Sequence, residues 1–165
     1  MSVYSASIDD NDPAMTYSPD WVLITSDGSW TGTMHSTSIL GASASFRFTG
    51  KCVGHRALKY EETAHAVRLG SRVAIICIIP TGNSGASTRA TVSIDGGAAV
   101  SVSHVTTGPV QYGVVLWDSG PLPLKNHLVT LTNAGTEDYL RFDRVDYDPT
   151  DGNAPTTSYG TPSHL

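Results

Sequence analysis

The amino-acid sequence predicts an all-β protein in which two antiparallel sheets pack face to face as a sandwich. Short segments with alternating polar and apolar residues recur along most of the chain, and clusters of Gly, Asn, Asp and Pro separate them. Charged residues make up only 15% of the chain, and the glutamates and lysines that favour exposed helix number three each. The length of 165 residues is enough for one domain of ordinary size.

Two segments illustrate the strand pattern. Ser43 to Thr49 alternates, with Phe46 and Phe48 on one face and polar or small residues on the other, which predicts a half-buried strand. Val73 to Ile79 is a continuous apolar run of strand length. Such a run is typical of a central strand that is covered on both faces.

The clearest hairpin lies between residues 88 and 105. Thr88 to Ile94 alternates, then meets the turn-forming pair Asp95-Gly96, and Val100 to Val105 follows. Three further strands are predicted toward the C-terminus, at Tyr112 to Trp117, Leu128 to Thr132 and Tyr139 to Tyr147.

One segment, Lys51 to Gly70, differs in composition from the rest of the chain, because it is rich in charged residues and histidine. Leu58 to Leu69 is predicted to form a short helix ended by Gly70, as an insertion over one end of the sandwich. A second interpretation is that the segment is foreign to the domain, such as a translated intron. Its removal would join Gly50 directly to Ser71 in a plausible turn between two strands.

The predicted domain covers residues 1–149. Residues 150–165 have no periodic apolar content and are interpreted as a tail or linker. No apolar run reaches the roughly 18 residues of a membrane span, and the first residues lack the basic start and apolar core of a secretory signal.

Several functions are made improbable by composition and motifs. The net charge of -5 opposes a phosphate backbone, so we expect no nucleic-acid partner. Sequence motifs of serine hydrolases, zinc proteases and nucleotide-binding enzymes are absent, and the histidines are scattered without a metal-binding spacing. Cys77 lies within an apolar run and is interpreted as a buried thiol rather than a nucleophile. We therefore expect a protein that is not an enzyme.

Several short motifs follow one another in a fixed order along the chain. They are Ile8-Asp9-Asp10-Asn11-Asp12-Pro13, Thr16-Tyr17-Ser18, Trp21, Gly32-Thr33-Met34-His35, Gly41 to Gly50, Val92 to Gly97, Leu131-Thr132-Asn133 and Phe142 to Tyr147. This ordered set resembles a known family, the ectodomain of many basidiomycete cell-surface proteins, which is similar to the galactose-binding-like jelly roll of carbohydrate-binding modules. The resemblance covers Ile8 to Asp148 except Lys51 to Gly70, and it implies a jelly-roll fold, a carbohydrate partner and an extracellular or cell-surface location.

Sugar recognition needs a flat aromatic face and fixed polar groups, and both are found in the turn-rich segments. Trp30, in the turn-rich segment from Ser26 to Gly32, is the first candidate platform. Tyr112 and Trp117 form a second aromatic group near a strand end. The alternative for both tryptophans is packing in the interior, because tryptophan is highly buried on average. The candidate hydroxyl partners are Asp27, His35, Asp118 and Arg141.

Aspartates gather near both ends of the predicted domain. Asp9, Asp10 and Asp12 lie near its start, whereas Asp143 and Asp146 lie near its end. The two ends commonly run side by side in a jelly roll, and clustered carboxylates with hard oxygen ligands suit calcium. Similar carbohydrate-binding modules often hold a structural calcium where their terminal strands meet. The alternative is a solvated turn whose side chains bond their own backbone.

The sequence therefore predicts a non-catalytic, lectin-like module that binds glycan through loop aromatics and polar side chains. One alternative is a structural or adhesion module of a fungal cell-surface protein, which self-associates or binds wall proteins. Exposed sheet edges are templates for such association. A third interpretation is an auxiliary domain of a larger enzyme.

Overall fold

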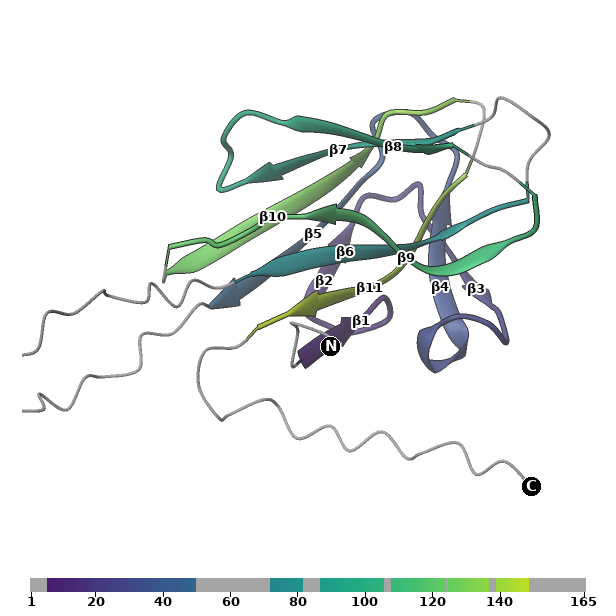
Figure 1. Ribbon diagram of the computed structural model, residues 1–165, viewed down its shortest axis with the longest axis horizontal. Coiled ribbons are helices and arrows are strands. Elements are labelled where there is room, and N and C mark those ends of the chain that lie inside the picture. The colour runs from purple at the N-terminus through teal and green to yellow at the C-terminus, as the bar shows by residue number, and fades with distance from the viewer. Residues whose placement is uncertain are drawn as a thin grey trace, which may run out of the picture.

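The computed structural model describes residues 6–49, 72–81, 87–105, 108–123, 125–136 and 139–148, which form two antiparallel sheets (Figure 1). The prediction of an all-β jelly-roll sandwich is confirmed. In the six-stranded sheet, the order is β3 (Val22–Thr25), β4 (Thr33–Thr37), β11 (Leu140–Tyr147), β6 (Val73–Ile79) and β9 (Gln111–Asp118), and β1 (Ala6–Asp9) also pairs with β11. In the five-stranded sheet, the order is β2 (Met15–Tyr17), β5 (Ser43–Thr49), β10 (Asn126–Asn133), β7 (Ser87–Ile94) and β8 (Val100–Val105).

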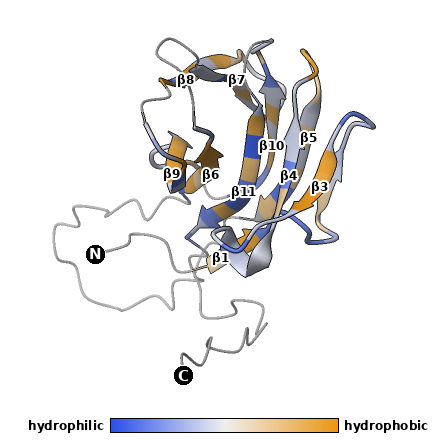
Figure 2. Cartoon of the chain, turned by 90° about the vertical axis from the view of Figure 1, so that its right-hand side faces the viewer, coloured by the Kyte–Doolittle hydropathy of each residue, from blue (hydrophilic) through white to orange (hydrophobic). Residues whose placement is uncertain are grey.

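The alternation of residue types in each strand decides which side chains enter the core. In β10 every second residue is buried, and the hydropathy colouring of Figure 2 shows the same alternation. All seven residues of β6 are buried, as its continuous apolar run predicts. Val73, Ile75 and Cys77 of β6 face the core between the sheets, because they belong to its contiguous apolar cluster.

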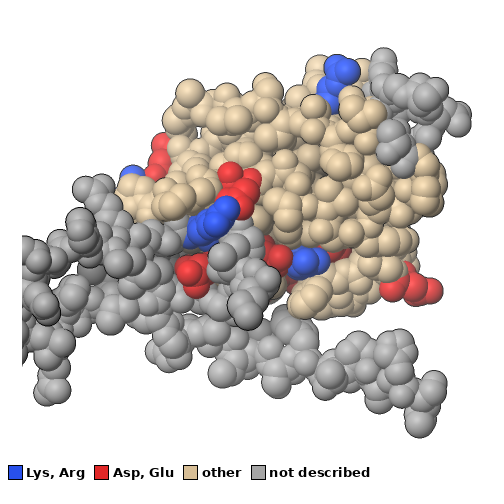
Figure 3. Space-filling view, in the orientation of Figure 1, with Lys and Arg blue, Asp and Glu red and all other residues tan. Residues whose placement is uncertain are grey.

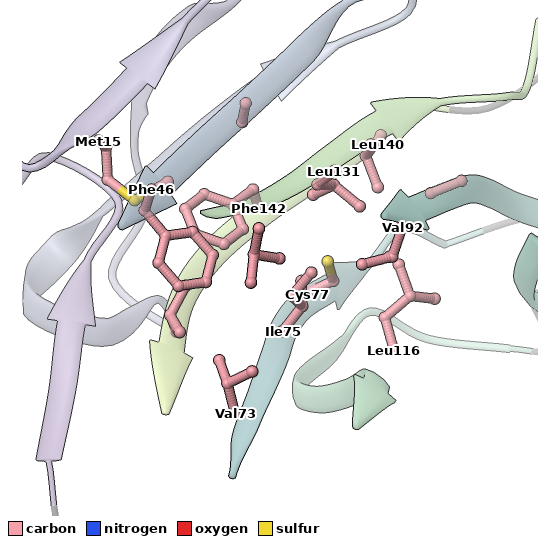
Figure 4. Close-up of a cluster of buried hydrophobic side chains, with 14 of the residues drawn as sticks. Met15, Phe46, Val73, Ile75, Cys77, Val92, Leu116, Leu131, Leu140 and Phe142 are labelled. Atoms are coloured by element: carbon pink, nitrogen blue, oxygen red, sulfur yellow. The ribbon is translucent and has the colours of Figure 1, made fainter. Parts of the chain in front are cut away.

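The core fills the space between the two sheets (Figure 4). Phe142 of β11 and Val129 of β10 are among its fully enclosed side chains. Burial of the Cys77 thiol raises its pKa well above the ordinary value, which leaves the thiol protonated and inert. The larger members of the cluster include Met15, Phe46, Phe48, Ile75, Leu116, Leu131, Leu140 and Phe142.

The β7–β8 hairpin has the predicted turn. Asp95 and Gly96 both have positive φ, at 54° and 70°, and the Gly97 N–H donates to the Ile94 carbonyl at 2.9 Å. Positive φ at both central residues is typical of a type I′ turn, whose twist matches the flanking strands.

The structure also contains elements that the sequence analysis did not identify. These elements are the strands β1, β2, β3 and β4, which are all short. Tyr139 precedes β11 rather than starting it. The predicted helix at 58–69, its parent segment 51–70 and the tail at 150–165 lie outside the described residues. In the part of the chain that is described, no helix has the length and hydropathy to cross a membrane.

The pairing of β1 with β11 brings the first and last described strands together. Ala6 lies opposite Tyr147, and Asp9 lies opposite Arg144. This confirms the expectation that the two ends of the domain run side by side. It also places the acidic residues of both ends beside the β3–β4 loop.

Candidate functional site

Trp30 lies in the loop between β3 and β4, where it begins the 3₁₀ turn Trp30–Gly32. Its side chain is 43% exposed. The Trp30 backbone N–H donates to Asp143 Oδ1 at 2.8 Å, and the Arg144 guanidinium carbon lies 4.7 Å from the centre of the indole ring. This distance is within the range of a cation–π contact. Strand β11 therefore holds the indole in place, although almost half of the side chain remains open to a ligand.

Thr31 fixes the same turn to strand β1. Its φ of 55° is in the left-handed region, which is uncommon for a β-branched residue. The Thr31 hydroxyl donates to Asp9 Oδ2 at 2.7 Å, whereas Asp9 Oδ1 is buried without a hydrogen-bond partner among the described residues. A strained turn that is held by a specific side-chain contact is a feature of functional loops.

Asp10 is fully buried beneath the loop. Its Oδ1 accepts a hydrogen bond from the Thr33 hydroxyl at 2.8 Å, and its Oδ2 lies 2.7 Å from His35 Nδ1. Burial raises the pKa of Asp10 above its ordinary value, while the hydrogen bonds from His35 and Thr33 oppose that rise. This short contact fixes the orientation of the His35 ring relative to Asp10.

His35 is clamped by an aromatic ring on the opposite sheet. Its imidazole stacks on Tyr17 of β2, with ring centres 4.0 Å apart and an interplanar angle of 8°. The Tyr17 hydroxyl donates to the Asp10 backbone carbonyl at 2.6 Å, and burial is the main cause of its strongly raised pKa. His35 is therefore a positioned, half-buried group rather than a free surface histidine.

Arg144 joins the remaining carboxylates of β11. It donates to Asp143 Oδ2 at 3.0 Å and to Asp146 Oδ1 at 2.8 Å, while the Ser7 hydroxyl also donates to Asp146 at 2.7 Å. Asp143 is buried, and burial is the main cause of its raised pKa. Figure 3 shows that acidic and basic side chains lie close together along the lower part of one face of the molecule.

Tyr112 reaches the same loop from β9. An ideal Cβ added to Gly28 would lie only 2.3 Å from Tyr112 Cζ, so the two residues are in close contact. Tyr112 is 49% exposed, and Asp27, next to Gly28, is also exposed. The structure thus gathers three of the predicted ligand residues, Trp30, Asp27 and Tyr112, around one loop.

A fourth predicted ligand residue, His35, lies beneath the loop against Asp10, and the other three lie elsewhere. Trp117 is partly buried and packs against the core. Asp118 accepts two hydrogen bonds from Arg72, at 2.8 and 2.7 Å. Arg141 lies 5.8 Å from the centre of the Tyr139 ring, and its Nε is buried without a partner in the described part of the chain.

The predicted calcium ligands meet only in part. Asp9, Asp10 and Asp143 gather beside the loop, whereas Asp12 accepts a hydrogen bond from the Ala14 N–H at 2.8 Å, as in the predicted turn. The carboxylate oxygens of Asp10, Asp143 and Asp146 already face hydroxyl, imidazole, guanidinium or amide groups. Among the described residues, no group of three or more His, Cys, Asp or Glu side chains is placed to hold a metal ion. The calcium site therefore stays a prediction.

The comparison with known proteins defines the class of fold. No family model matches the chain, and no curated protein matches it. The solved structures that resemble it include family 35 carbohydrate-binding modules (CBM35), so the chain has a CBM35-like jelly-roll fold.

Three neighbours show the range of this likeness. The CBM35 of Cellvibrio japonicus Abf62 has a TM-score of 0.58 at 17% identity, over 90% of this chain and 99% of that one. Xyl-CBM35, solved with a glucuronic acid containing disaccharide, has a TM-score of 0.59 at 16% identity, over 87% and 92% of the two chains. The exo-β-1,3-galactanase of Phanerochaete chrysosporium has a TM-score of 0.54 at 15% identity. The match covers 87% of this chain but only 29% of the galactanase.

Sequence reasoning missed part of the site. Thr31 was not singled out at all, and Tyr17, Thr33 and Arg144 were noted only within family motifs. One signal was present for Arg144, since an arginine between Asp143 and Asp146 is placed to neutralise both. The packing of Tyr112 on Gly28 had no local signal.

Proposed function

We propose that the chain is a non-catalytic carbohydrate-binding module whose ligand site is the β3–β4 loop. The observation that supports this proposal most is Trp30. It is a 43% exposed indole on a loop, and hydrogen bonding and an Arg144 contact hold it in one orientation. A preoriented aromatic ring offers a flat apolar face at low entropic cost.

The neighbouring residues supply the rest of a sugar site. Tyr112 adds a second exposed ring against Gly28. The exposed Asp27 carboxylate, next to Gly28 in the chain, can accept hydrogen bonds from sugar hydroxyls. The Asp10–His35 pair supports the loop from below. The likeness to CBM35 modules adds weight, as does the printed description of one neighbour as bound to a glucuronic acid containing disaccharide. An extracellular or cell-surface location is part of the same proposal.

A glycan array tests the proposal directly. We expect the wild type to bind a restricted set of glycans, and Trp30→Ala and Tyr112→Ala to lose at least about tenfold in affinity, as interface aromatics typically do. Tyr139→Ala removes an exposed tyrosine outside the loop and serves as the matched control. Absence of glycan binding by the wild type, or wild-type binding by Trp30→Ala, would refute the loop site.

A second candidate function, a self-associating adhesion module, is favoured by strand β3. This edge strand exposes three apolar side chains in succession, Val22, Leu23 and Ile24, with exposed fractions of 62%, 47% and 37%. Exposed apolar edge strands promote pairing with other chains. Light scattering at several concentrations separates the two candidates, because a monomer that binds sugar supports the first and a sugar-blind assembly supports the second.

A further inference from the structure

The outer face of the five-stranded sheet carries hydroxyl side chains in two rows. Strand register places one hydroxyl from each of four neighbouring strands in each row. The first row is Thr16, Ser45, Thr130 and Ser93, on β2, β5, β10 and β7. The second row is Ser43, Thr132, Thr91 and Ser101, on β5, β10, β7 and β8.

These hydroxyls are available to a ligand. In the described part of the chain, no hydrogen bond uses any of the eight side-chain oxygens, and none of the eight residues is buried. Neighbouring strands of a sheet are about 4.8 Å apart, and successive residues on the same face of a strand are about 6.7 Å apart. A regular array of free donors and acceptors at this spacing can contact several hydroxyls of an extended polysaccharide at once.

An arginine lies at each end of the array. Arg47, opposite Leu128 on β10, precedes the first row, and Arg89, opposite Ser103 on β8, follows the second row. Both side chains are exposed. The two residues are six residues apart along the strand direction, which corresponds to about 20 Å. None of the outward-facing positions on the described strands of this sheet carries Asp or Glu, so the face is locally cationic in a chain of net charge -5.

The Arg47 end of the array is hollowed. A depression of about 410 Å³ is lined by Ala14, Thr16, Ser45, Phe46, Arg47 and Leu128. It lies at the edge of β2 where that strand begins with Met15, opposite Phe46, whereas β5 continues to Thr49. Its volume is within the range of small-ligand pockets. A ligand group seated there would contact the Arg47 guanidinium and the Thr16 and Ser45 hydroxyls.

We propose that this face is a second glycan-binding surface, specific for a linear polysaccharide that carries carboxylates. The hydroxyl rows would bind the sugar hydroxyls, and Arg47 and Arg89 would bind carboxylates along the chain through their planar, two-pronged donors. Among its described residues this face has no exposed aromatic ring for stacking, so charge would supply the affinity that an indole would supply at the loop site. The inference shares with the proposed function the premise that the chain binds glycan, but it does not depend on Trp30.

Polygalacturonate and its fully methyl-esterified form test the proposal, since they share a backbone and differ in charge. We expect the wild type to bind polygalacturonate, with affinity reduced at least about tenfold in the Arg47→Gln, Arg89→Gln double variant. Thr130→Val keeps the shape of the side chain and removes one hydroxyl, and it should reduce affinity by about threefold. Circular dichroism and thermal melting confirm that each variant is folded.

Controls separate this surface from the loop site and from general attraction of polyanions. Lys125→Gln removes an exposed cation outside the array, and Trp30→Ala disrupts only the loop; both should bind polygalacturonate as the wild type does. Equal binding of the esterified polymer, or wild-type affinity in the double arginine variant, would overturn the proposal. So would equal binding of dextran sulfate together with no effect of Thr130→Val, which indicates general charge attraction. Loss of polygalacturonate binding in Trp30→Ala alone would assign the acidic glycan to the loop site instead.

Discussion

The ring of Tyr112 lies where a side chain on Gly28 would have to be. An ideal Cβ at Gly28 would be 2.3 to 2.8 Å from three carbons of that ring. The contact joins the β3–β4 loop to strand β9, although the two segments are more than eighty residues apart in sequence. It therefore positions Tyr112 relative to Trp30.

Gly28→Ala tests this relationship. The added methyl group displaces the ring of Tyr112, which is the mobile end of its side chain, so we expect weaker glycan binding with little change in thermal stability. Gly135→Ala is the matched control, because its added Cβ meets neighbours at an ordinary distance of 3.6 Å. Isothermal titration with an array-selected glycan measures the effect. Unchanged affinity in Gly28→Ala would show that Tyr112 does not contribute to the site.

Arg144→Ala is expected to destabilise the fold. Asp143 is buried, and removal of its cationic partner leaves an uncompensated buried carboxylate, which costs about 3 kcal/mol or more. Lys125→Ala removes an exposed, solvent-screened ion pair with Asp95 and should destabilise the fold much less than Arg144→Ala does. Urea denaturation compares the two variants. A similar decrease in the free energy of unfolding for both variants would mean that the contacts of Arg144 with Asp143 and Asp146 are not effectively buried.

Stability should depend on pH in opposite directions at two aspartates. Burial raises the pKa of Asp10 above its ordinary value, so the folded state binds its proton more tightly than the unfolded state. Its contribution to folding is present below about pH 4, the ordinary pKa, and is lost as the pH rises through the raised pKa. The hydrogen bond from Lys125, followed by that from the Leu128 N–H, lowers the pKa of Asp95, so its contribution is present above about pH 4 and is lost at lower pH.

Asn substitutions at each position measure these contributions. The free energy of unfolding of the wild type, minus that of Asp10→Asn, should fall as the pH rises from about 4. The corresponding difference for Asp95→Asn should rise over the acidic range up to about pH 4. Urea titrations at several pH values measure both differences, and slopes of the same sign for the two variants would contradict the assignment.

Calcium should not stabilise the protein through the loop cluster. The carboxylates of Asp10 and Asp143 already accept hydrogen bonds from Thr33, Trp30 and Arg144. A calcium ion would have to displace these donors. Thermal melting with calcium in excess and with a chelator should therefore give the same midpoint, and a calcium-dependent rise that Asp143→Asn abolishes would restore the predicted calcium site.

Strands with an alternating or a continuous apolar pattern were predicted to within one or two residues, because burial of one face or of both faces leaves a pattern in the sequence. Ser43–Thr49 and Val73–Ile79 are correct at both ends. Strand β3 left no such pattern, since all four of its residues are exposed and three are apolar. Strand β2, with three residues, is too short to show a period.

The residue types of the candidate site were predicted from the sequence, but the contacts between them were not. Trp30 and the aspartates near both chain ends were identified because exposed aromatics and clustered acids are visible locally. The roles of Arg144 and Tyr112 arise from register between distant strands, such as Asp9 opposite Arg144. One sequence carries no information on such pairing, so Trp117 and Asp118 were grouped with Tyr112 although their side chains pack elsewhere.

The antiparallel pairing of β1 with β11 makes the loop site sensitive to proteolysis of the N-terminal strand. Only four residues of β1 pair with β11, and Asp9, the last of them, holds Thr31. Proteolytic removal of this short strand would release the turn that carries the indole, while the cluster between the sheets would keep its main components. The cleaved protein would then still unfold cooperatively but would no longer bind glycan. A bound oligosaccharide should slow the cleavage.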